Sequence, residues 1–304
     1  MNKLRNWLIL MGILSLMFGC GKDPAYKKKS GKWQYQGETI NPVREPVNFQ
    51  PIDDYFAKDD KVAYYRGTPI ADEVRSSDPA TFQVLNKYYA KDKSTVYFCD
   101  TERDSKEYWS VRRNVIRNIR DADPATFRLL GQSGLARDKR YLFRAAKAIH
   151  VNDLDSFTVL DAGFARDKVS GYYLDDEIKG SDGASFTALG ANYAKDKQAV
   201  YYVDGIVIGG TIKDVDLASF KALDNAYAHD SGKVYFRGIT ISDQDAPALT
   251  VLPMGYAKTS KQVFHNGKLV ADADPASFAV TDKPSTSVDA TDKAGKFASG
   301  KRIK

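Results

Sequence analysis

The chain repeats one short motif along most of its length, and this repetition limits the possible folds more than any other feature. The clearest copy runs from Tyr193 to Tyr202 and reads Tyr-Ala-Lys-Asp-Lys, then three residues, then a Tyr-Tyr doublet. A period of this size is typical of repeat proteins, in which each unit buries its apolar face against its neighbours. Fold and function must therefore be inferred repeat by repeat. The copies lie 29 to 46 residues apart and are marked by Asp59, Asp92, Asp138, Asp167, Asp196 and Asp230, with Thr259 in the last copy.

Each repeat of about 30 residues has three parts. The Tyr-Ala-Lys-Asp segment and the aromatic doublet predict a β-hairpin, and a glycine such as Gly205 predicts a turn into a further short strand. The third part is typified by residues 78–85, Asp-Pro-Ala-Thr-Phe-Gln-Val-Leu. Aspartate favours the N-cap, proline favours the first helical position, and Phe82 and Leu85 would share one helix face. The sequence therefore predicts an α+β repeat protein with a β-meander and a short helix in each of about seven modules.

One such module is too small to fold alone. Burying one Phe and one Leu stabilises it by roughly 3 to 6 kcal/mol, whereas ordering its backbone costs at least about 1 kcal/mol per residue. We therefore expect the modules to stack into a mainly β, solenoid-like array, with a closed propeller-like ring as the alternative. The predicted repeat domain spans 32–281, and 282–304 is a polar tail with a degenerate half repeat.

The N-terminus has the pattern of a signal peptide over residues 1–19. Two basic residues precede an apolar run over 7–18, which is too short to span a bilayer. The run Leu16-Met17-Phe18-Gly19-Cys20 resembles the lipobox of bacterial lipoproteins. This resemblance implies that Cys20 is acylated after cleavage and, because Gly21 rather than aspartate follows, that the protein is anchored to the outer membrane and faces the periplasm. A plain secretory signal with an incidental cysteine is the alternative.

Basic residues are concentrated directly after Cys20, where we expect a basic tether over 20–31. The formal net charge is +6, and its local excess comes from Lys22, Lys27, Lys28, Lys29 and Lys32. Each could gain about 1 kcal/mol from anionic lipid headgroups, so the charge requires no nucleic acid partner. Cys99 is the one further cysteine, and we expect it to be buried. With Cys20 acylated, no second thiol is left to form an intramolecular disulfide or a multi-cysteine metal site with it.

The repeated motif offers little chemistry. We interpret its aspartates as turn residues that cap backbone groups at a hairpin corner rather than as acids or metal ligands, and we expect no catalytic residue, metal or cofactor. Adjacent residues on a strand point to opposite faces. One member of each aromatic doublet could therefore join an outward stripe that binds sugar rings or a protein, unless neighbouring modules cover both faces.

The best candidate binding site is the one break in the period. The second unit is 46 residues long, and its insertion over about 101–119 adds side chains of the types enriched in interface hot spots. Insertions in repeat proteins often lie on the binding face. The alternative is a longer hairpin whose arginines are merely solvated. The candidate residues are Tyr108, Trp109, Arg112, Arg113 and Arg117.

The run from Ala194 to Tyr202 resembles the bacterial DKNYY repeat family, and the resemblance covers about residues 50–280. It implies a secreted or lipid-anchored protein of unestablished activity, and it identifies no catalytic residue. The prediction is a lipid-anchored envelope protein that acts as a non-enzymatic interaction scaffold for a protein or glycan partner. The alternatives are a periplasmic immunity or inhibitor protein that blocks a toxin or enzyme, and a cell-wall-active enzyme.

Overall fold

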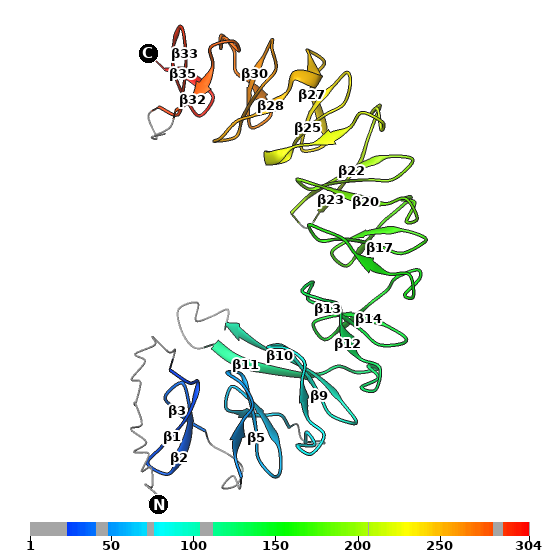
Figure 1. Cartoon of the computed structure of the whole chain (residues 1–304), viewed down its shortest axis with the longest axis vertical. Helices are drawn as coiled ribbons and strands as arrows, with labels where there is room; N and C mark the ends of the chain where they lie inside the picture. The colour runs from blue at the N-terminus through cyan, green and yellow to red at the C-terminus, as the bar shows by residue number, and fades with distance from the viewer. Residues whose placement is uncertain are drawn as a thin grey trace, which may run out of the picture. The chain divides into compact units, whose positions relative to one another are not determined.

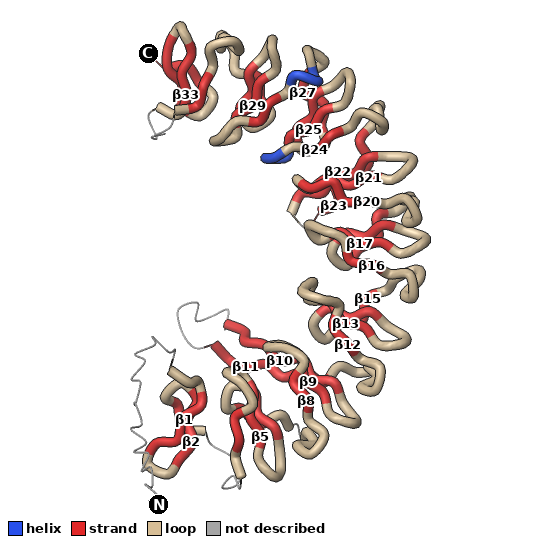
Figure 2. The backbone as a smooth tube through the Cα atoms, in the orientation of Figure 1, coloured by secondary structure: helices blue, strands red, loops and turns tan. Residues whose placement is uncertain are grey.

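The fold is almost entirely β. The computed structural model describes residues 23–40, 48–71, 76–103, 112–205, 207–281 and 288–303. Within these ranges one three-stranded and eight four-stranded sheets follow one another along the chain (Figure 1). The helical segments of this part are two short 3-10 turns, η1 (Asp224–Ala226) and η2 (Ala246–Ala248), drawn in blue in Figure 2. No helix in the described part is long and apolar enough to cross a membrane.

The chain divides into two compact units, and the division falls within the third sheet. Unit 1 comprises Met1–Lys93 and Cys99–Ile116, and unit 2 comprises Ser94–Phe98 and Arg117–Lys304. The strands of the first three sheets are β1 (Tyr26–Lys29), β2 (Lys32–Tyr35), β3 (Glu38–Thr39); β4 (Gln50–Pro51), β5 (Phe56–Lys58), β6 (Ala63–Tyr65), β7 (Thr68–Pro69); and β8 (Gln83–Val84), β9 (Tyr89–Lys91), β10 (Val96–Arg103), β11 (Arg112–Asn118).

Six further sheets lie in unit 2. Their strands are β12 (Arg128–Leu129), β13 (Leu135–Arg137), β14 (Leu142–Arg144), β15 (Lys147–Ile149); β16 (Thr158–Val159), β17 (Phe164–Arg166), β18 (Gly171–Tyr173), β19 (Asp176–Ile178); β20 (Thr187–Gly190), β21 (Tyr193–Lys195), β22 (Val200–Asp204), β23 (Val207–Ile212); β24 (Lys221–Ala222), β25 (Tyr227–His229), β26 (Val234–Phe236), β27 (Ile239–Ser242); β28 (Thr250–Val251), β29 (Tyr256–Lys258), β30 (Val263–His265), β31 (Lys268–Leu269); and β32 (Ala279–Val280), β33 (Ala290–Asp292), β34 (Gly295–Ala298), β35 (Lys301–Ile303).

Each sheet with its turns is one module, and each four-stranded sheet is a meander in which consecutive strands are antiparallel neighbours. The Tyr-Ala-Lys-Asp segment forms the second strand and the aromatic doublet forms the third. In the sheet of β24 to β27, for example, Tyr227 lies opposite Phe236 and Ala228 lies opposite Tyr235. The predicted meander and the repeat array are thus confirmed.

The predicted helix in each module is wrong. At residues 78–82 the chain makes a single turn, in which the backbone N–H of Thr81 donates to the carbonyl of Asp78 (3.3 Å) and that of Ala80 donates to Asp78 Oδ1 (3.1 Å). The next residues leave the turn and pair as β8 with β9. The aspartate therefore caps a single turn. Forming the first turn of a helix is unfavourable unless further turns follow, and none follow here. The chain gains more by extending as an edge strand.

The hydrophobic core is divided among the contacts between successive modules. In an interior module such as that of β24 to β27, one face of the sheet packs on the preceding module. In β25 and β26, this face presents Ala228 and Tyr235, which join one apolar cluster with Tyr193 and Tyr202 of the preceding module. Ala228 is fully buried. A small side chain is needed at this position because the preceding module lies close to the sheet.

The opposite face packs on the following module. There Tyr227 and Val234 lie in one cluster with Ala257 and Phe264. Because both faces are covered, both members of a doublet such as Tyr64 and Tyr65 are buried (1% and 2% exposed). The doublets therefore form no outward stripe, and the alternative in which neighbours cover both faces is correct.

A glycine in the turn between the third and fourth strands permits this close stacking. Gly238 has a positive φ of 75°, and a Cβ there would lie 2.8 Å from Cβ of Tyr202 in the preceding module. A larger residue would therefore force the two modules apart.

The structure extends the array at both ends. The first sheet begins at Tyr26, within the segment expected to be a tether. At the other end, β32 to β35 make the expected half repeat a complete four-stranded sheet.

Candidate functional site

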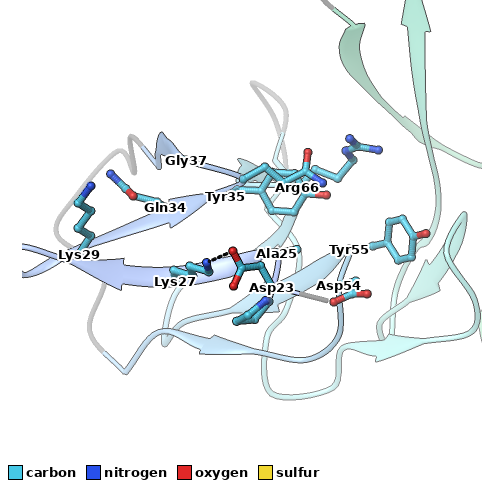
Figure 3. A pocket seen from close by; sticks show the side chains of 12 residues that line it. Asp23, Ala25, Lys27, Lys29, Gln34, Tyr35, Gly37, Asp54, Tyr55 and Arg66 are labelled. Atoms are coloured by element: carbon cyan, nitrogen blue, oxygen red, sulfur yellow. Dashed lines mark ion pairs between the residues drawn. The ribbon is translucent and has the colours of Figure 1, made fainter. Parts of the chain in front are cut away.

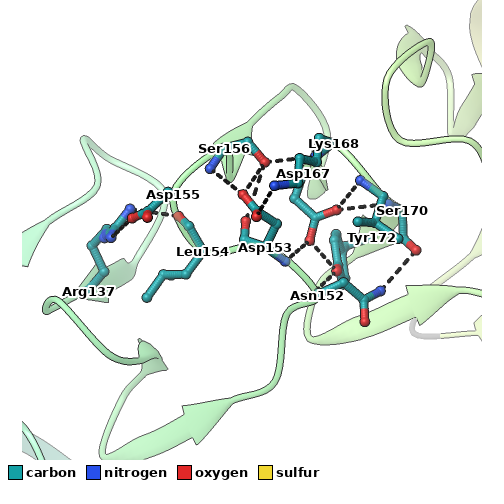
Figure 4. A network of polar contacts seen from close by, with 11 residues as sticks. Arg137, Asn152, Asp153, Leu154, Asp155, Ser156, Asp167, Lys168, Ser170 and Tyr172 are labelled. Carbon is teal, nitrogen blue, oxygen red and sulfur yellow. Dashed lines mark hydrogen bonds and ion pairs between the residues drawn. The ribbon is translucent and has the colours of Figure 1, made fainter.

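The motif aspartate is the centre of a buried hydrogen-bond network in the modules that contain it. In the module of Asp167, Oδ1 accepts the backbone N–H of Val169 (2.7 Å) and Ser170 (2.8 Å) at the hairpin corner. Its Oδ2 accepts the hydroxyl of Tyr172 (2.6 Å) and the backbone N–H of Asp153 (2.7 Å), as Figure 4 shows. One side chain thereby joins the hairpin, the first doublet tyrosine and the preceding turn.

The same network recurs along the chain and confirms the turn role predicted for these aspartates. A doublet tyrosine also donates to Asp59, Asp196 and Asp230 (2.6 to 2.8 Å). With their acceptor atoms engaged, these carboxylates are structural groups rather than acids or metal ligands. The backbone N–H of an upstream aspartate also donates to Asp92, Asp138, Asp196, Asp230 and Asp292.

The lysine after the motif aspartate has a structural role as well. Lys168 Nζ lies 2.6 Å from Oδ2 of Asp153, the aspartate that caps the preceding turn. The lysine side chains are mostly exposed, so each pair is worth little by itself. Equivalent pairs are Lys93 with Asp78, Lys139 with Asp123, Lys197 with Asp182, and Lys293 with Asp274.

The first tyrosine of the motif connects one module to the next. Tyr193 donates its hydroxyl hydrogen to the carbonyl of Ala226 (2.9 Å) and accepts the backbone N–H of Gly238 (3.1 Å). Its burial raises its pKa above the usual range, so it stays a neutral donor. The repeated tyrosine, lysine and aspartate of the motif therefore serve folding within a module and stacking between modules. Tyr26 and Tyr227 make the same pair of contacts, whereas Tyr256 accepts the backbone N–H of Gly300 but donates to the carboxylate of Asp289.

Acid should weaken these turns. Hydrogen bonds from Lys168 and Ser156 lower the pKa of Asp153 to about 2, and Lys197 with Ser185 does the same for Asp182. An unfolded aspartate has a pKa of about 3.9. Because the folded pKa is the lower one, the stabilisation is complete above about pH 4 and is lost as the pH falls towards about 2.

The measurement is the urea midpoint at pH 7, 4, 3 and 2. We expect a constant midpoint down to about pH 4 and a steep fall below it. A Lys168→Met variant lacks one cation that lowers the pKa of Asp153, so its decline should begin at higher pH. A midpoint that stays constant to pH 2 would contradict this account of the turns.

Outside the repeated motif, the most distinctive feature is the long hairpin of β10 and β11. It contains the insertion predicted from the sequence, and Arg112, Arg113 and Arg117 are exposed on β11. Neighbouring residues on a strand point to opposite faces, so Arg112 and Arg113 diverge. Tyr108 and Trp109 lie outside the described residues, as does Cys20.

Arg112 lines a hollow of about 640 Å³ within unit 1. The neighbouring Asn114 fixes the strand there, because its amide donates to Thr68 Oγ1 (2.8 Å) and to the carbonyl of Arg66 (3.3 Å). The rest of this hollow comes from the first two modules: Tyr35, Gln36, Glu38, Thr39, Ile40, Arg66, Gly67 and Thr68.

A second hollow of about 620 Å³ adjoins the first and shares Tyr35, Gln36 and Arg66 with it. The Arg66 guanidinium carbon lies 5.5 Å from the centre of the Tyr35 ring, at the boundary between the hollows. Lys27 in the second hollow is paired with Asp23 (2.9 Å), as Figure 3 shows. We call the two hollows together the unit-1 groove.

The groove is polar and carries more positive than negative side chains. Lys27, Lys29, Arg66 and Arg112 face three carboxylates, while Tyr35 and Tyr55 add aromatic surface; the carboxylates are Asp23, Glu38 and Asp54. In the described part of the chain, no group of three or more His, Cys, Asp or Glu residues could hold a metal ion. Cys99 is fully buried, as predicted, and this burial raises the pKa of its thiol.

Of the residues predicted from the insertion, the structure brings Arg112 into the groove and leaves Arg113 and Arg117 outside its lining. Sequence analysis missed Arg66. Arg66 has a φ of 49° in a two-residue hairpin turn, and Ala145, Leu174 and Arg237 occupy the same turn position with φ of 50 to 54°. The sequence therefore held no signal that distinguishes Arg66 from its counterparts in other modules.

Comparison with known proteins gives the family but no activity. The family model described as the DKNYY family matches residues 22–101, 55–205 and 206–304. No curated protein matches the chain, and no solved structure does. The three matched regions cover the chain from residue 22 to its end, so this repeat protein belongs to the DKNYY family.

Proposed function

We propose that this protein is a lipid-anchored scaffold of the bacterial envelope, without enzymatic activity, that binds a protein or glycan partner through the unit-1 groove. The anchor is an acylated Cys20, and the outer membrane with the repeat array in the periplasm is the proposed location. The lipobox-like run over residues 16–20 supports the anchor.

One observation carries the binding part of the proposal. The repeated aspartates, lysines and tyrosines are occupied by hydrogen bonds within and between modules, so they build the array. The β10–β11 hairpin instead departs from the period, and it contributes Arg112 to the groove within unit 1. Arginine and tyrosine are also residue types enriched in binding hot spots.

The test is affinity capture from envelope extract and from purified peptidoglycan. The bait is the chain from residue 20 onward with Cys20→Ser, either otherwise unchanged or with Arg112→Glu. An Arg128→Glu bait is the matched control, because Arg128 is also an exposed strand arginine but lies in unit 2. We expect a partner recovered in stoichiometric amount, about tenfold less on Arg112→Glu and unchanged on Arg128→Glu, since a hot spot contributes more than about 1.4 kcal/mol.

Equal recovery on all three baits would move the binding site away from the groove. The absence of both a protein partner and peptidoglycan binding would contradict the scaffold. A single tight protein partner that inhibits growth or an enzyme when free would instead favour the immunity or inhibitor function.

A further inference from the structure

We propose that the outward face of the first module is a docking surface for an anionic lipid bilayer, so that the array rests on the membrane instead of extending from it on a tether. The inference relies on the proposed anchor at Cys20 and specifies how the anchored chain meets the membrane. It begins from the correspondence between the first module and the interior ones.

The hairpin of β1 and β2 has the same pattern as that of β25 and β26. Both contain a Ser-Gly-Lys turn, at residues 30–32 and 231–233. In the interior hairpin, the face towards the preceding module is apolar and contains Ala228 and Tyr235. The corresponding residues of the first hairpin are Lys27 and Gln34, which lie opposite each other in the sheet. The position of the motif aspartate is taken by Lys29.

The other face of the first module keeps the interior pattern. Tyr26 and Tyr35 are buried and pack with Ala57 and Tyr64 of the second module. The module is therefore apolar where it meets the array and polar on its outward side, which is how terminal repeats keep an array soluble.

The last module has a polar outward side too, but of a different kind. Ala290 and Phe297 remain fully buried towards the preceding module. Its outward side carries the exposed Lys296, where the preceding module has Val263. Asp289 is buried and accepts the hydroxyl of Tyr256 (2.7 Å). The β33–β34 hairpin has two lysines, of which Lys293 pairs with Asp274 (3.4 Å), whereas the first hairpin has four.

The first module concentrates positive charge without neutralising it. Lys27, Lys28, Lys29 and Lys32 are exposed on one hairpin. Lys27 pairs with Asp23, whose side chain is 89% exposed. Within the described ranges, no ion pair joins Lys28, Lys29 or Lys32 to an acidic side chain. Such a hairpin would attract an anionic surface.

Chain length identifies the occupant as a membrane. Asp23 is three residues after Cys20, and three residues extend over at most about 11 Å. An acylated Cys20 would therefore hold the lysine hairpin at the headgroup level, where each lysine raises binding about fivefold. Lys27 and Lys29 also line the second hollow of the unit-1 groove, so a partner of the docked protein would contact the groove through the first hollow, at Arg112.

The experiment uses the chain from residue 20 onward, which contains every described residue, with Cys20→Ser so that no acyl chain contributes. Flotation is measured with vesicles of three parts phosphatidylethanolamine to one part phosphatidylglycerol, and with vesicles of phosphatidylcholine alone. We expect binding to the anionic vesicles only, weakening as salt rises. Lys29→Glu with Lys32→Glu changes two lysines that lie opposite each other on the outward face and should reduce the binding at least thirtyfold. The matched control, Lys296→Glu with Lys301→Glu, makes the same charge change on exposed lysines of the last module and should change it less than twofold.

Several results would overturn the proposal: no binding of the unaltered chain to the anionic vesicles, equal binding to both kinds of vesicle, or equal loss in the two double variants. Vesicle binding that persists in Lys29→Glu with Lys32→Glu would do the same, because another surface would then bind the bilayer. The mass of the Cys20 peptide from the natural host reports acylation separately, and capture with the Arg112→Glu bait reports the groove. A failure of this proposal is therefore distinguishable from a failure of the scaffold.

Discussion

Replacing Asp196 with alanine is expected to lower the free energy of unfolding by about 4 kcal/mol. The carboxylate is 4% exposed and accepts four hydrogen bonds. They come from the backbone N–H groups of Asp182, Gln198 and Ala199 and from the hydroxyl of Tyr201, at 2.7 to 2.8 Å. Each donor left without its partner costs about 1 kcal/mol. The loss should also release the hairpin corner from the preceding turn.

The chain contains its own precedent for a milder change. In the module of Thr259, Oγ1 accepts the backbone N–H of Lys261 (3.2 Å) and Gln262 (3.1 Å), as an aspartate would. Threonine has no second acceptor oxygen for a tyrosine, and the tyrosine is replaced there by Phe264. The carboxylate acceptor and the tyrosine hydroxyl donor are thus both absent from this module. In another module, we expect that replacing both groups lowers the free energy of unfolding by less than the sum of the two single replacements.

A double-mutant cycle on Asp196→Thr and Tyr201→Phe measures this coupling in urea unfolding. We expect the double variant to lose about 1 kcal/mol less than the sum of the single variants. Asp204→Ala is the matched control, because Asp204 is an exposed aspartate of the same module whose pair with Arg237 (3.4 Å) is worth less than about 1 kcal/mol. Strict additivity, or a loss at Asp196 no larger than that at Asp204, would show that the network contributes little.

The repeat could be predicted from the sequence because its most regular residues are the ones that build it. Asp196 and its counterparts each cap the hairpin corner of one module. Their spacing along the chain therefore equals the length of a module. The short helix could not be predicted correctly. Asp78 favours the start of a helix, but residues 83 and 84 pair with β9 as a strand. The sequence around Asp78 does not reveal this pairing.

The candidate site was predictable only in part. The break in the period led to Arg112, because an insertion is visible as a change in spacing. Arg66 and Tyr35 could not be associated with Arg112, since they are separated from it by more than 40 residues and meet it through the stacking of modules. The polar outward face of the first module could not be predicted for a related reason. Lys27 is unusual only when it is compared with the alanines that are buried at the same position of later modules.

Changing Gly171 to valine should destabilise the protein by about 3 kcal/mol, although valine occupies the same position in other modules, as Val200 and Val234 show. A Cβ at Gly171 would lie 2.4 Å from Cδ2 of Phe186, whose ring is fully buried. Forcing a branched side chain into a filled core typically costs 1 to 3 kcal/mol, and this contact is at the tight end of that range.

The reason is local to this pair of modules. The ring of Phe186 occupies the space beside Gly171 and also packs near Phe164, with 6.0 Å between ring centres. Shortening the ring residue should therefore relieve the clash. The measurement compares the urea midpoints of Gly171→Val, Phe186→Leu and the double variant, and we expect the double variant to be more stable than Gly171→Val alone. If Gly171→Val instead raised the midpoint, the glycine would be a tolerated deviation from the repeat and not the counterpart of Phe186.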